Sequence, residues 1–413
     1  MNIELKELKD YVSLTQGLAI NEGSAHLVSS IKNDEFSLPL LRITDMMENK
    51  YEKYISNKVQ RNVVANFSDI IYTRTGQIGL VFTGKYGVVH NNSFIVKIIN
   101  NELLPEYLYA ILQTNFVRNQ AISFAHNSVQ PDLTHDMFKS IKIPVPSKIE
   151  QLKFANVYSC LTAKIENNNT INNNLQQTIN TIYEYWFYQF EFPNNENKPY
   201  KSNNGNLIWN KELKRNIPAD WKVQNFYNNE LYKLISSGID KFKVKTYLAT
   251  ADVNGISINN GSIINFETRE SRANMQPVLY SVWFAKMKNS VKHLFLNKEM
   301  NKIIDNYILS TGFYGFQCSE NSFEYVSSII SSTHFENLKD LLSHGATQQG
   351  ITDDDLKNIK LLVPNIDVLN KFHNATKGLY SQLSHNLVEN KRLVELRNYL
   401  LPLLMNGQAT IDK

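Results

Sequence analysis

The amino-acid sequence predicts an α+β chain made of two tandem copies of one mixed α/β unit, each copy ending in a long helix. Three observations support this fold class. A segment is repeated at a constant offset of 218 residues, alternating apolar and polar residues precede each copy of it, and a helical stripe of apolar residues follows each copy. At 413 residues the chain has room for two or three domains with cores of their own.

The repeat is clearest between residues 126–146 and 344–364, which align without a gap. Nine of these 21 positions carry the same residue: His126/His344, Gln130/Gln348, Thr134/Thr352, Asp136/Asp354, Lys139/Lys357, Ile141/Ile359, Lys142/Lys360, Val145/Val363 and Pro146/Pro364. Tyr107 and Tyr325 keep the same offset upstream, and it continues downstream without a gap. Chance similarity between two amphipathic stretches is the alternative, but an ungapped offset over this length favours duplication.

The elements within each copy follow the same order. Alternation with turn residues, as in 68–89 and 265–270, indicates short strands and long loops. A short helix follows, and in the second copy Thr352 with three aspartates after it is a favourable helix N-terminus. Each repeated segment then closes with an apolar strand that ends in proline, at 141–146 and 359–364.

A long helix is predicted after each proline. Ser147 with Glu150 matches a capping box, and Asn365 occupies the equivalent cap position in the second copy. The apolar residues that follow are spaced as on one helix face: Phe154, Val157, Leu161, Ile165, Leu175, Ile179 and Ile182, then Phe372, Ala375, Leu379, Leu383, Leu393, Leu396 and Leu400. Such a stripe usually packs on its own domain, but two matching stripes favour helices that pack on each other in a coiled-coil-like seam. The asparagine runs at 167–169 and 172–174 do not suit a dry seam, so we expect that part to be polar or to face solvent.

These elements predict four parts: a globular domain at 1–146, a central long helix at 147–192, a second globular domain at 193–364 and a C-terminal long helix at 365–413. The aromatic run at 183–193 ends the central helix. It contains no Lys or Arg, which usually alternate with base-stacking aromatics, so a core or partner-docking role is favoured over a base-stacking platform.

Composition excludes several classes of protein. Lys plus Arg is 43 and Asp plus Glu is 39, which argues against both a histone-like coat and an acidic disordered tail. Residues 1–146 carry equal numbers of basic and acidic side chains, so a DNA-facing surface there must be a local patch. The two cysteines support neither a disulfide framework nor a Cys-based zinc site, and no apolar run is long enough to span a bilayer. The expected compartment is the cytoplasm.

No catalytic or metal-binding constellation is predicted. Gly79, Gly84 and Lys85 have the spacing of a phosphate-binding loop, but Tyr86 replaces the required Ser or Thr, and the residues between the glycines alternate as in a strand. The nine histidines form no metal-binding pair, and His126 and His344 are more simply loop residues that share a hydrogen-bonding role. A divergent enzyme stays open as an alternative.

The order of these segments resembles that of the specificity (S) subunits of type I restriction–modification systems, over essentially the whole chain. The segments that carry the resemblance are 128–146, 346–364, 183–192, 217–223 and 387–408, with the strand-like segments 40–46, 247–253 and 310–316. The resemblance implies two target recognition domains, each reading one half of a bipartite, asymmetric sequence in double-stranded DNA. It also implies that the two long helices pair antiparallel about a pseudo-twofold axis and set the spacing between the half-sites.

The resemblance further implies that this chain is a non-catalytic part of a multisubunit methyltransferase and endonuclease. Two methyltransferase subunits dock along the helices and methylate adenine at N6, and restriction (motor and nuclease) subunits complete the complex. S-adenosylmethionine, ATP and magnesium are then expected in the partner subunits only, with no metal, cofactor or membrane contact here. A bacterial or archaeal source is expected.

Base readout needs side chains that match groove edges, such as Arg or Lys for guanine and Asn or Gln for adenine. In the first domain the candidates are Arg74, Gln77, Lys85, Asn91, Asn92 and Gln130. In the second domain they are Arg269, Arg272, Lys286, Lys288, Gln348 and Gln349. For each of them the alternative is an ordinary solvated residue. The rival functions are a stand-alone DNA-processing enzyme and a structural adaptor that binds proteins.

Overall fold

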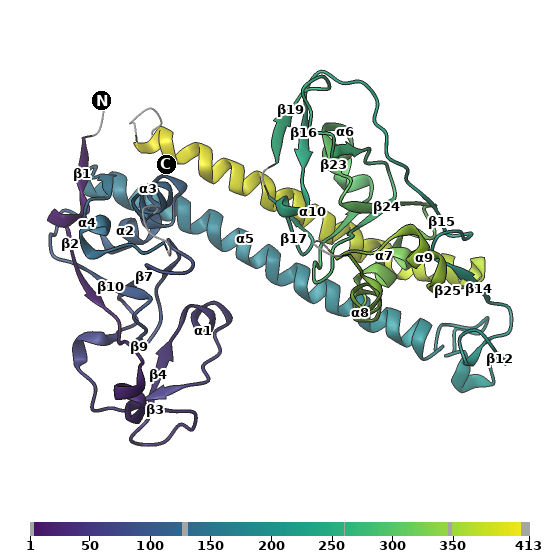
Figure 1. Ribbon diagram of the computed structural model, residues 1–413, viewed down its shortest axis with the longest axis horizontal. Helices are drawn as coiled ribbons and strands as arrows, with labels where there is room; N and C mark the ends of the chain where they lie inside the picture. The colour runs from purple at the N-terminus through teal and green to yellow at the C-terminus, as the bar shows by residue number, and fades with distance from the viewer. Residues whose placement is uncertain (1–3, 126–130, 260, 346–348, 406–413) are drawn as a thin grey trace. The chain divides into compact units, whose positions relative to one another are not determined.

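The structure is a computed structural model that describes residues 4–125, 131–259, 261–345 and 349–405. It divides into two compact units. The first unit comprises Met1–Lys164 with Leu393–Lys413, and the second comprises Ile165–Arg392. Both predicted long helices are present (Figure 1): α5 at Lys148–Tyr183, which continues into a π-helical turn to Tyr188, and α10 at Ile366–Met405. Among the described residues no helix is both long and apolar enough to cross a membrane.

The first unit contains a four-stranded antiparallel sheet in the order β2-β10-β7-β8. Its strands are β2 (Val12–Gln16), β10 (Ser93–Ile98), β7 (Ile70–Thr73) and β8 (Val81–Phe82). Three helices share a buried apolar core with this sheet: α2 (Pro105–Leu112), α3 (Asn115–Ala125) and α4 (His135–Lys139). Phe154 and Tyr158 of α5 belong to the same core, so the start of the long helix is fixed to its domain.

A five-stranded sheet with the order β3-β5-β4-β9-β6 completes the first unit. Its strands are β3 (Val28–Ser29), β5 (Tyr54–Ile55), β4 (Leu38–Leu41), β9 (Gly87–Val89) and β6 (Val64–Ala65), and α1 (Ile43–Glu48) follows β4. The segment 68–89 therefore supplies short strands, as its alternation predicts.

The second unit repeats the first sheet. Its order is β15-β24-β21-β22, formed by β15 (Tyr232–Leu234), β24 (Phe313–Cys318), β21 (Ser281–Ala285) and β22 (His293–Leu296). The helices are α7 (Phe323–Ser331), α8 (Thr333–Leu342) and α9 (Asp353–Asn358). A second sheet contains β19 (Ser262–Ile264), β16 (Lys245–Leu248), β23 (Tyr307–Ser310) and β20 (Ala273–Met275), with α6 (Asn301–Asn306) beside it. Residues 265–270 form a turn after β19.

Smaller strand pairs complete the fold. Two hairpins belong to the second unit: β12 (Leu207–Asn210) with β13 (Arg215–Pro218), and β17 (Val253–Asn254) with β18 (Ser257–Ile258). The pairs that close each copy are β1 (Leu5–Glu7) with β11 (Lys142–Pro144) and β14 (Lys222–Asn225) with β25 (Lys360–Val363).

These closing pairs have the same register in the two copies. Lys6 lies opposite Ile143, and Gln224 lies opposite Leu361, so both partners are displaced by the 218 residues of the sequence repeat. The tandem duplication predicted from the sequence is therefore present in the backbone pairing.

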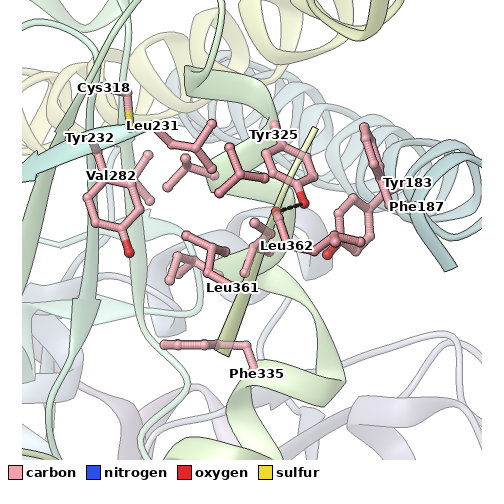
Figure 2. Packing of buried hydrophobic residues seen from close by; sticks show 14 of the residues in the cluster. Tyr183, Phe187, Leu231, Tyr232, Val282, Cys318, Tyr325, Phe335, Leu361 and Leu362 are labelled. Atoms are coloured by element: carbon pink, nitrogen blue, oxygen red, sulfur yellow. Dashed lines mark hydrogen bonds between the residues drawn. The ribbon is translucent and has the colours of Figure 1, made fainter. Parts of the chain in front are cut away.

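One buried side-chain hydrogen bond is also repeated at the same offset. The Tyr107 hydroxyl of α2 donates to the Pro144 carbonyl of β11 at 2.8 Å. The Tyr325 hydroxyl of α7 donates to the Leu362 carbonyl of β25 at 2.6 Å, as Figure 2 shows. Burial raises the pKa of both tyrosines well above the ordinary value, so each hydroxyl keeps its proton and acts as a donor.

The predicted helix caps form. Ser147 accepts from the Glu150 backbone N–H at 3.4 Å, and the Glu150 carboxylate accepts from the Ser147 backbone N–H at 3.0 Å. At α9 the backbone N–H and the hydroxyl of Thr352 donate to Asp355 Oδ2 at 2.8 and 2.6 Å, and at α10 Asn365 Oδ1 accepts from the backbone N–H of Val368 at 2.9 Å.

The long helices pack on each other through a polar layer. In the second unit the Asn386 amide donates to Asn172 Oδ1 at 2.8 Å, and the Asn168 amide donates to Asn390 Oδ1 at 2.9 Å. Residue numbers fall along α10 as they rise along α5, so the helices run antiparallel. Asn168, Asn172 and Asn386 are almost completely buried. The polar middle expected from the asparagine runs is confirmed, but Asn168 and Asn172 face the partner helix instead of solvent.

The eight residues predicted to pair the helices differ in burial. Ile179 and Leu383 are buried, and Leu161, Ile165, Leu175, Leu379 and Leu393 are partly buried. The prediction for Leu396 is wrong, because this side chain is 43% exposed. Its neighbour Arg397 donates to Thr162 instead, at 3.4 Å within the first unit, and one residue turns a helix face by about 100°.

The aromatic run at the end of α5 is core, as predicted. Tyr183, Trp186 and Phe187 are buried in the main apolar cluster of the second unit, where the Phe187 ring lies 4.4 Å from that of Tyr325 (Figure 2). Phe190 and Phe192 belong to the same cluster.

We predict that Tyr107→Phe and Tyr325→Phe each lower the free energy of unfolding by about 1–3 kcal/mol, because each leaves a buried carbonyl without a donor. Urea denaturation followed by circular dichroism measures the change. Tyr399→Phe is the matched control, since Tyr399 is 67% exposed, and it should leave the midpoint unchanged. Equal midpoints for all three variants would contradict a structural role for the repeated bond.

Candidate nucleic-acid interface

In the first unit, loops from three parts of the chain meet beside the end of β7. The Arg74 backbone N–H donates to the Asn92 carbonyl at 2.8 Å, and the Arg74 carbonyl accepts from the Leu133 N–H at 3.0 Å. The predicted residues Arg74, Asn91 and Asn92 are therefore neighbours. Leu133 contacts Arg74 from a distant part of the sequence.

The Arg74 guanidinium is used within the protein. It donates to Asp132 Oδ2 at 2.5 Å, to the Leu133 carbonyl at 3.2 Å and to the Asn91 carbonyl at 3.3 Å, and it lies 5.5 Å from the Phe94 ring centroid. The side chain is only 13% exposed. These contacts indicate that Arg74 ties the loops together, and they neutralise its charge with Asp132.

The other candidates of the first domain occupy different settings. Gln77 is exposed on the turn after β7, where Gly76 adopts a left-handed conformation with φ of 74°. Lys85 lies between β8 and β9, and its ammonium donates to Asn49 Oδ1 at 2.6 Å, while burial lowers its pKa. Gln130 lies outside the described residues.

A corresponding set of loops meets beside the end of β21 in the second unit. The Lys286 backbone N–H donates to the Gly312 carbonyl at 2.9 Å, and the Lys288 N–H donates to the Gln349 carbonyl at 3.0 Å. The Arg272 carbonyl accepts from Thr311, the neighbour of Gly312. The structure thus brings Arg272, Lys286, Lys288 and Gln349 onto adjoining loops, whereas Gln348 lies outside the described residues.

Two basic side chains of this domain, Lys286 and Arg269, each lie over an aromatic ring. The Lys286 ammonium lies 4.2 Å from the Tyr314 ring centroid, and the Tyr314 hydroxyl donates to Asp353 at 2.5 Å. Arg269 is engaged locally instead, because its guanidinium donates to the Phe266 carbonyl at 2.6 Å and lies over the Phe266 ring.

The segment with phosphate-loop spacing does not form such a loop. Val81–Phe82 is strand β8, paired with β7, and the chain continues to β9 instead of entering a helix. Among the described residues no group of three or more His, Cys, Asp or Glu side chains is placed to hold a metal ion. His344, one of the repeated histidines, donates from its Nδ1 to the Leu342 carbonyl at 3.1 Å in a loop.

Comparisons with known proteins agree with this arrangement of domains. Residues 3–177 match the family described as type I restriction modification DNA specificity domain. The type I restriction enzyme MjaIX specificity subunit of Methanocaldococcus jannaschii is 25% identical over 364 residues, which is 83% of this chain and 78% of that protein. The HindI specificity subunit of Haemophilus influenzae is 22% identical over 379 residues, or 78% of this chain and 81% of that protein.

A solved structure has the same fold over the whole chain. The crystal structure of the type I restriction–modification S subunit from M. genitalium covers 100% of this chain and 98% of its own, with a TM-score of 0.53 and 12% identity. The fold that the two proteins share is therefore a pair of mixed α/β domains with two long helices. The family match covers residues 3–177 of this chain, and both named relatives are specificity subunits of type I restriction enzymes.

Sequence reasoning missed the partners of the predicted cations. Asp132 lies 58 residues from Arg74, and the Phe94 and Tyr314 rings belong to neighbouring strands, so spacing alone does not reveal these contacts. Knowledge of the strand pairing of β7 with β10, and of β21 with β24, is needed to find them.

We predict that Arg74→Met lowers the free energy of unfolding by about 1–3 kcal/mol, since Asp132 and two loop carbonyls lose their donor. Urea denaturation of the purified chain tests it. Gln77→Ala, three residues away on the exposed turn, should leave the midpoint within error. A midpoint for Arg74→Met equal to that of the Gln77 variant would show that the network adds no stability.

Proposed function

We propose that this chain is the DNA specificity subunit of a type I restriction–modification complex, in which each globular domain reads one half of a bipartite, asymmetric target. The observation that carries the proposal is the repeated frame of loops at the ends of β7 and β21, which presents polar and basic side chains from both copies. The family and the named relatives support it.

In this proposal the chain supplies recognition and the partner subunits supply the chemistry. Two methyltransferase subunits methylate adenine at N6 with S-adenosylmethionine, and restriction subunits use ATP and magnesium. Exposed apolar side chains on α5, Ile149 at 71% and Leu152 at 48%, support docking of protein partners along the helix. The paired helices fix the gap between the two half-sites. An archaeal and a bacterial relative support a prokaryotic, cytoplasmic setting.

The twelve candidate residues contribute differently under this proposal. Gln77, Arg272, Lys288 and Gln349 are exposed on the loops and are proposed to contact DNA directly. Arg74 and Arg269 hold their loops in place, so their effect on recognition is indirect. Asn91 and Asn92 lie beside Arg74 and are partly exposed, so their amides have access to a base edge.

We predict that the tagged chain, co-expressed with the methyltransferase subunit of its own system, purifies as a complex. That complex should methylate adenine in a two-part sequence with a fixed gap, measured by sequencing the modified bases of plasmid DNA. The chain without its partner should transfer no methyl groups. Failure to form the complex, or methylation with no common sequence, would sink the proposal, and methylation by the chain alone would favour the stand-alone enzyme.

A further inference from the structure

Arg74 and Lys286 occupy the same place in the two copies, although their sequence offset is 212 and not 218. Arg74 directly follows β7, and Lys286 directly follows β21. Each donates its backbone N–H to the carbonyl of the residue that precedes the paired strand, Asn92 before β10 and Gly312 before β24. Each also accepts at its carbonyl, from Leu133 at 3.0 Å in one copy and from Ile351 at 3.0 Å in the other.

The side chains of the two cations also lie on equivalent rings. Thr73 pairs with Ser93 in the first unit, and Ala285 pairs with Phe313 in the second, so the next residues along, Phe94 and Tyr314, correspond. The Arg74 guanidinium lies over the first ring and the Lys286 ammonium over the second. The two copies therefore place one cation each on a matched aromatic platform.

The copies differ in the counter-charge. In the first unit the backbone of Thr75 forms an isolated β-bridge with Asp132. In the second unit Met287 forms the matching β-bridge with Gly350. A glycine therefore occupies the position at which the first copy has its carboxylate. Among the described residues no carboxylate oxygen lies within 4.0 Å of the Lys286 ammonium. Asp353, the acidic group that acts on Lys286 electrostatically, accepts a hydrogen bond from the Tyr314 hydroxyl.

Within the described part of the chain, Lys286 is thus a partly buried cation without an ion-pair partner. Burial is the main influence on its pKa, which is lowered from the ordinary value. A desolvated cation of this kind is stabilised when an anion approaches, because the anion replaces the lost hydration and the missing carboxylate. Lys288 and Gln349 next to it are exposed, so the approach from the loop side is polar.

We propose that Lys286 is the site at which the second recognition domain binds a backbone phosphate of DNA, and that the first domain lacks this site because Asp132 already neutralises Arg74. The inference rests on the proposed function. A lysine ammonium suits phosphate as a point charge, and it lacks the planar fork with which arginine binds two acceptors at once. A phosphate contact at Lys286 adds affinity without adding sequence information.

The test measures DNA binding by the complex of this chain with its methyltransferase subunits at several NaCl concentrations. Two DNA duplexes are compared. One carries the sequence that the complex methylates, and the other carries the same sequence with its second half-site changed. Lys286→Met should make the slope of log affinity against log salt shallower by about one, and should weaken binding by the same factor on both duplexes. Lys286→Arg keeps the charge and should keep the wild-type slope.

A second pair of variants tests the counter-charge directly. Gly350→Asp adds to the second copy the carboxylate that the first copy has, and Gly350→Asn adds a side chain of the same shape without charge. A Cβ at this position meets the Lys286 carbonyl oxygen at 3.1 Å, so both variants disturb the loop equally. Gly350→Asp should reproduce the shallower slope of Lys286→Met, and Gly350→Asn should not.

A wild-type slope for Lys286→Met, or equal slopes for the two Gly350 variants, would overturn the inference while leaving the proposed function intact. A loss confined to the duplex with the intact second half-site would also overturn it, because that pattern marks a base contact. Absence of salt-dependent binding by the wild-type complex would contradict the proposed function itself, and this inference with it.

Discussion

In each copy a buried tyrosine hydroxyl holds the strand that leads into the long helix. Tyr107 of α2 and Tyr325 of α7 donate to carbonyls of β11 and β25, and in both copies the long helix starts four residues after that carbonyl. Among the described residues β11 and β25 each pair with one strand only, so a carbonyl on the other edge has no backbone donor, and an unpaired buried carbonyl is costly. The bond therefore fixes the point at which the chain leaves the domain and enters the helix. The register of the closing strands and the order of the sheets repeat together with it.

The two copies share the backbone hydrogen bonds of the loops beside β7 and β21 and differ in the side chains that the loops carry. The backbone hydrogen bonds that hold the loops at β7 and β21 are the same in both copies, with lengths that differ by about 0.1 Å. The side chains on the frame differ: Arg74 with Asp132 in one copy, Lys286 with Gly350 in the other. A constant frame with variable side chains suits a protein whose two domains read different halves of one target, because recognition can change without a change of fold.

Local signals in the sequence predicted much of this fold. The proline-ended strands, the Ser147 cap and the apolar stripes predicted both long helices and their mutual packing. The apolar stripe wrongly predicted Leu396 as a helix-pairing residue, because the contact there is made by Arg397. The pattern also did not show that Asn168 and Asn172 face the partner helix.

Long-range pairing limited the prediction of the site. The constant offset aligned Gln130 with Gln348 but not Arg74 with Lys286, because the loops between the strands differ in length in the two copies. The Asp132 partner of Arg74 belongs to another loop, so only the fold reveals which cation is neutralised. Spacing therefore identified candidate residues on loops, while the contacts of each residue depend on strand pairing that spacing does not contain.

Exchanging one domain tests the central claim most directly, namely that the two copies read separate half-sites. Residues 1–146 are replaced by the matching domain of a relative with a different target, and the methylated sequence of the resulting complex is determined by sequencing modified bases. Our account predicts that one half-site changes while the other half-site and the gap stay as in the wild type. A change in both halves, or in neither, would contradict it.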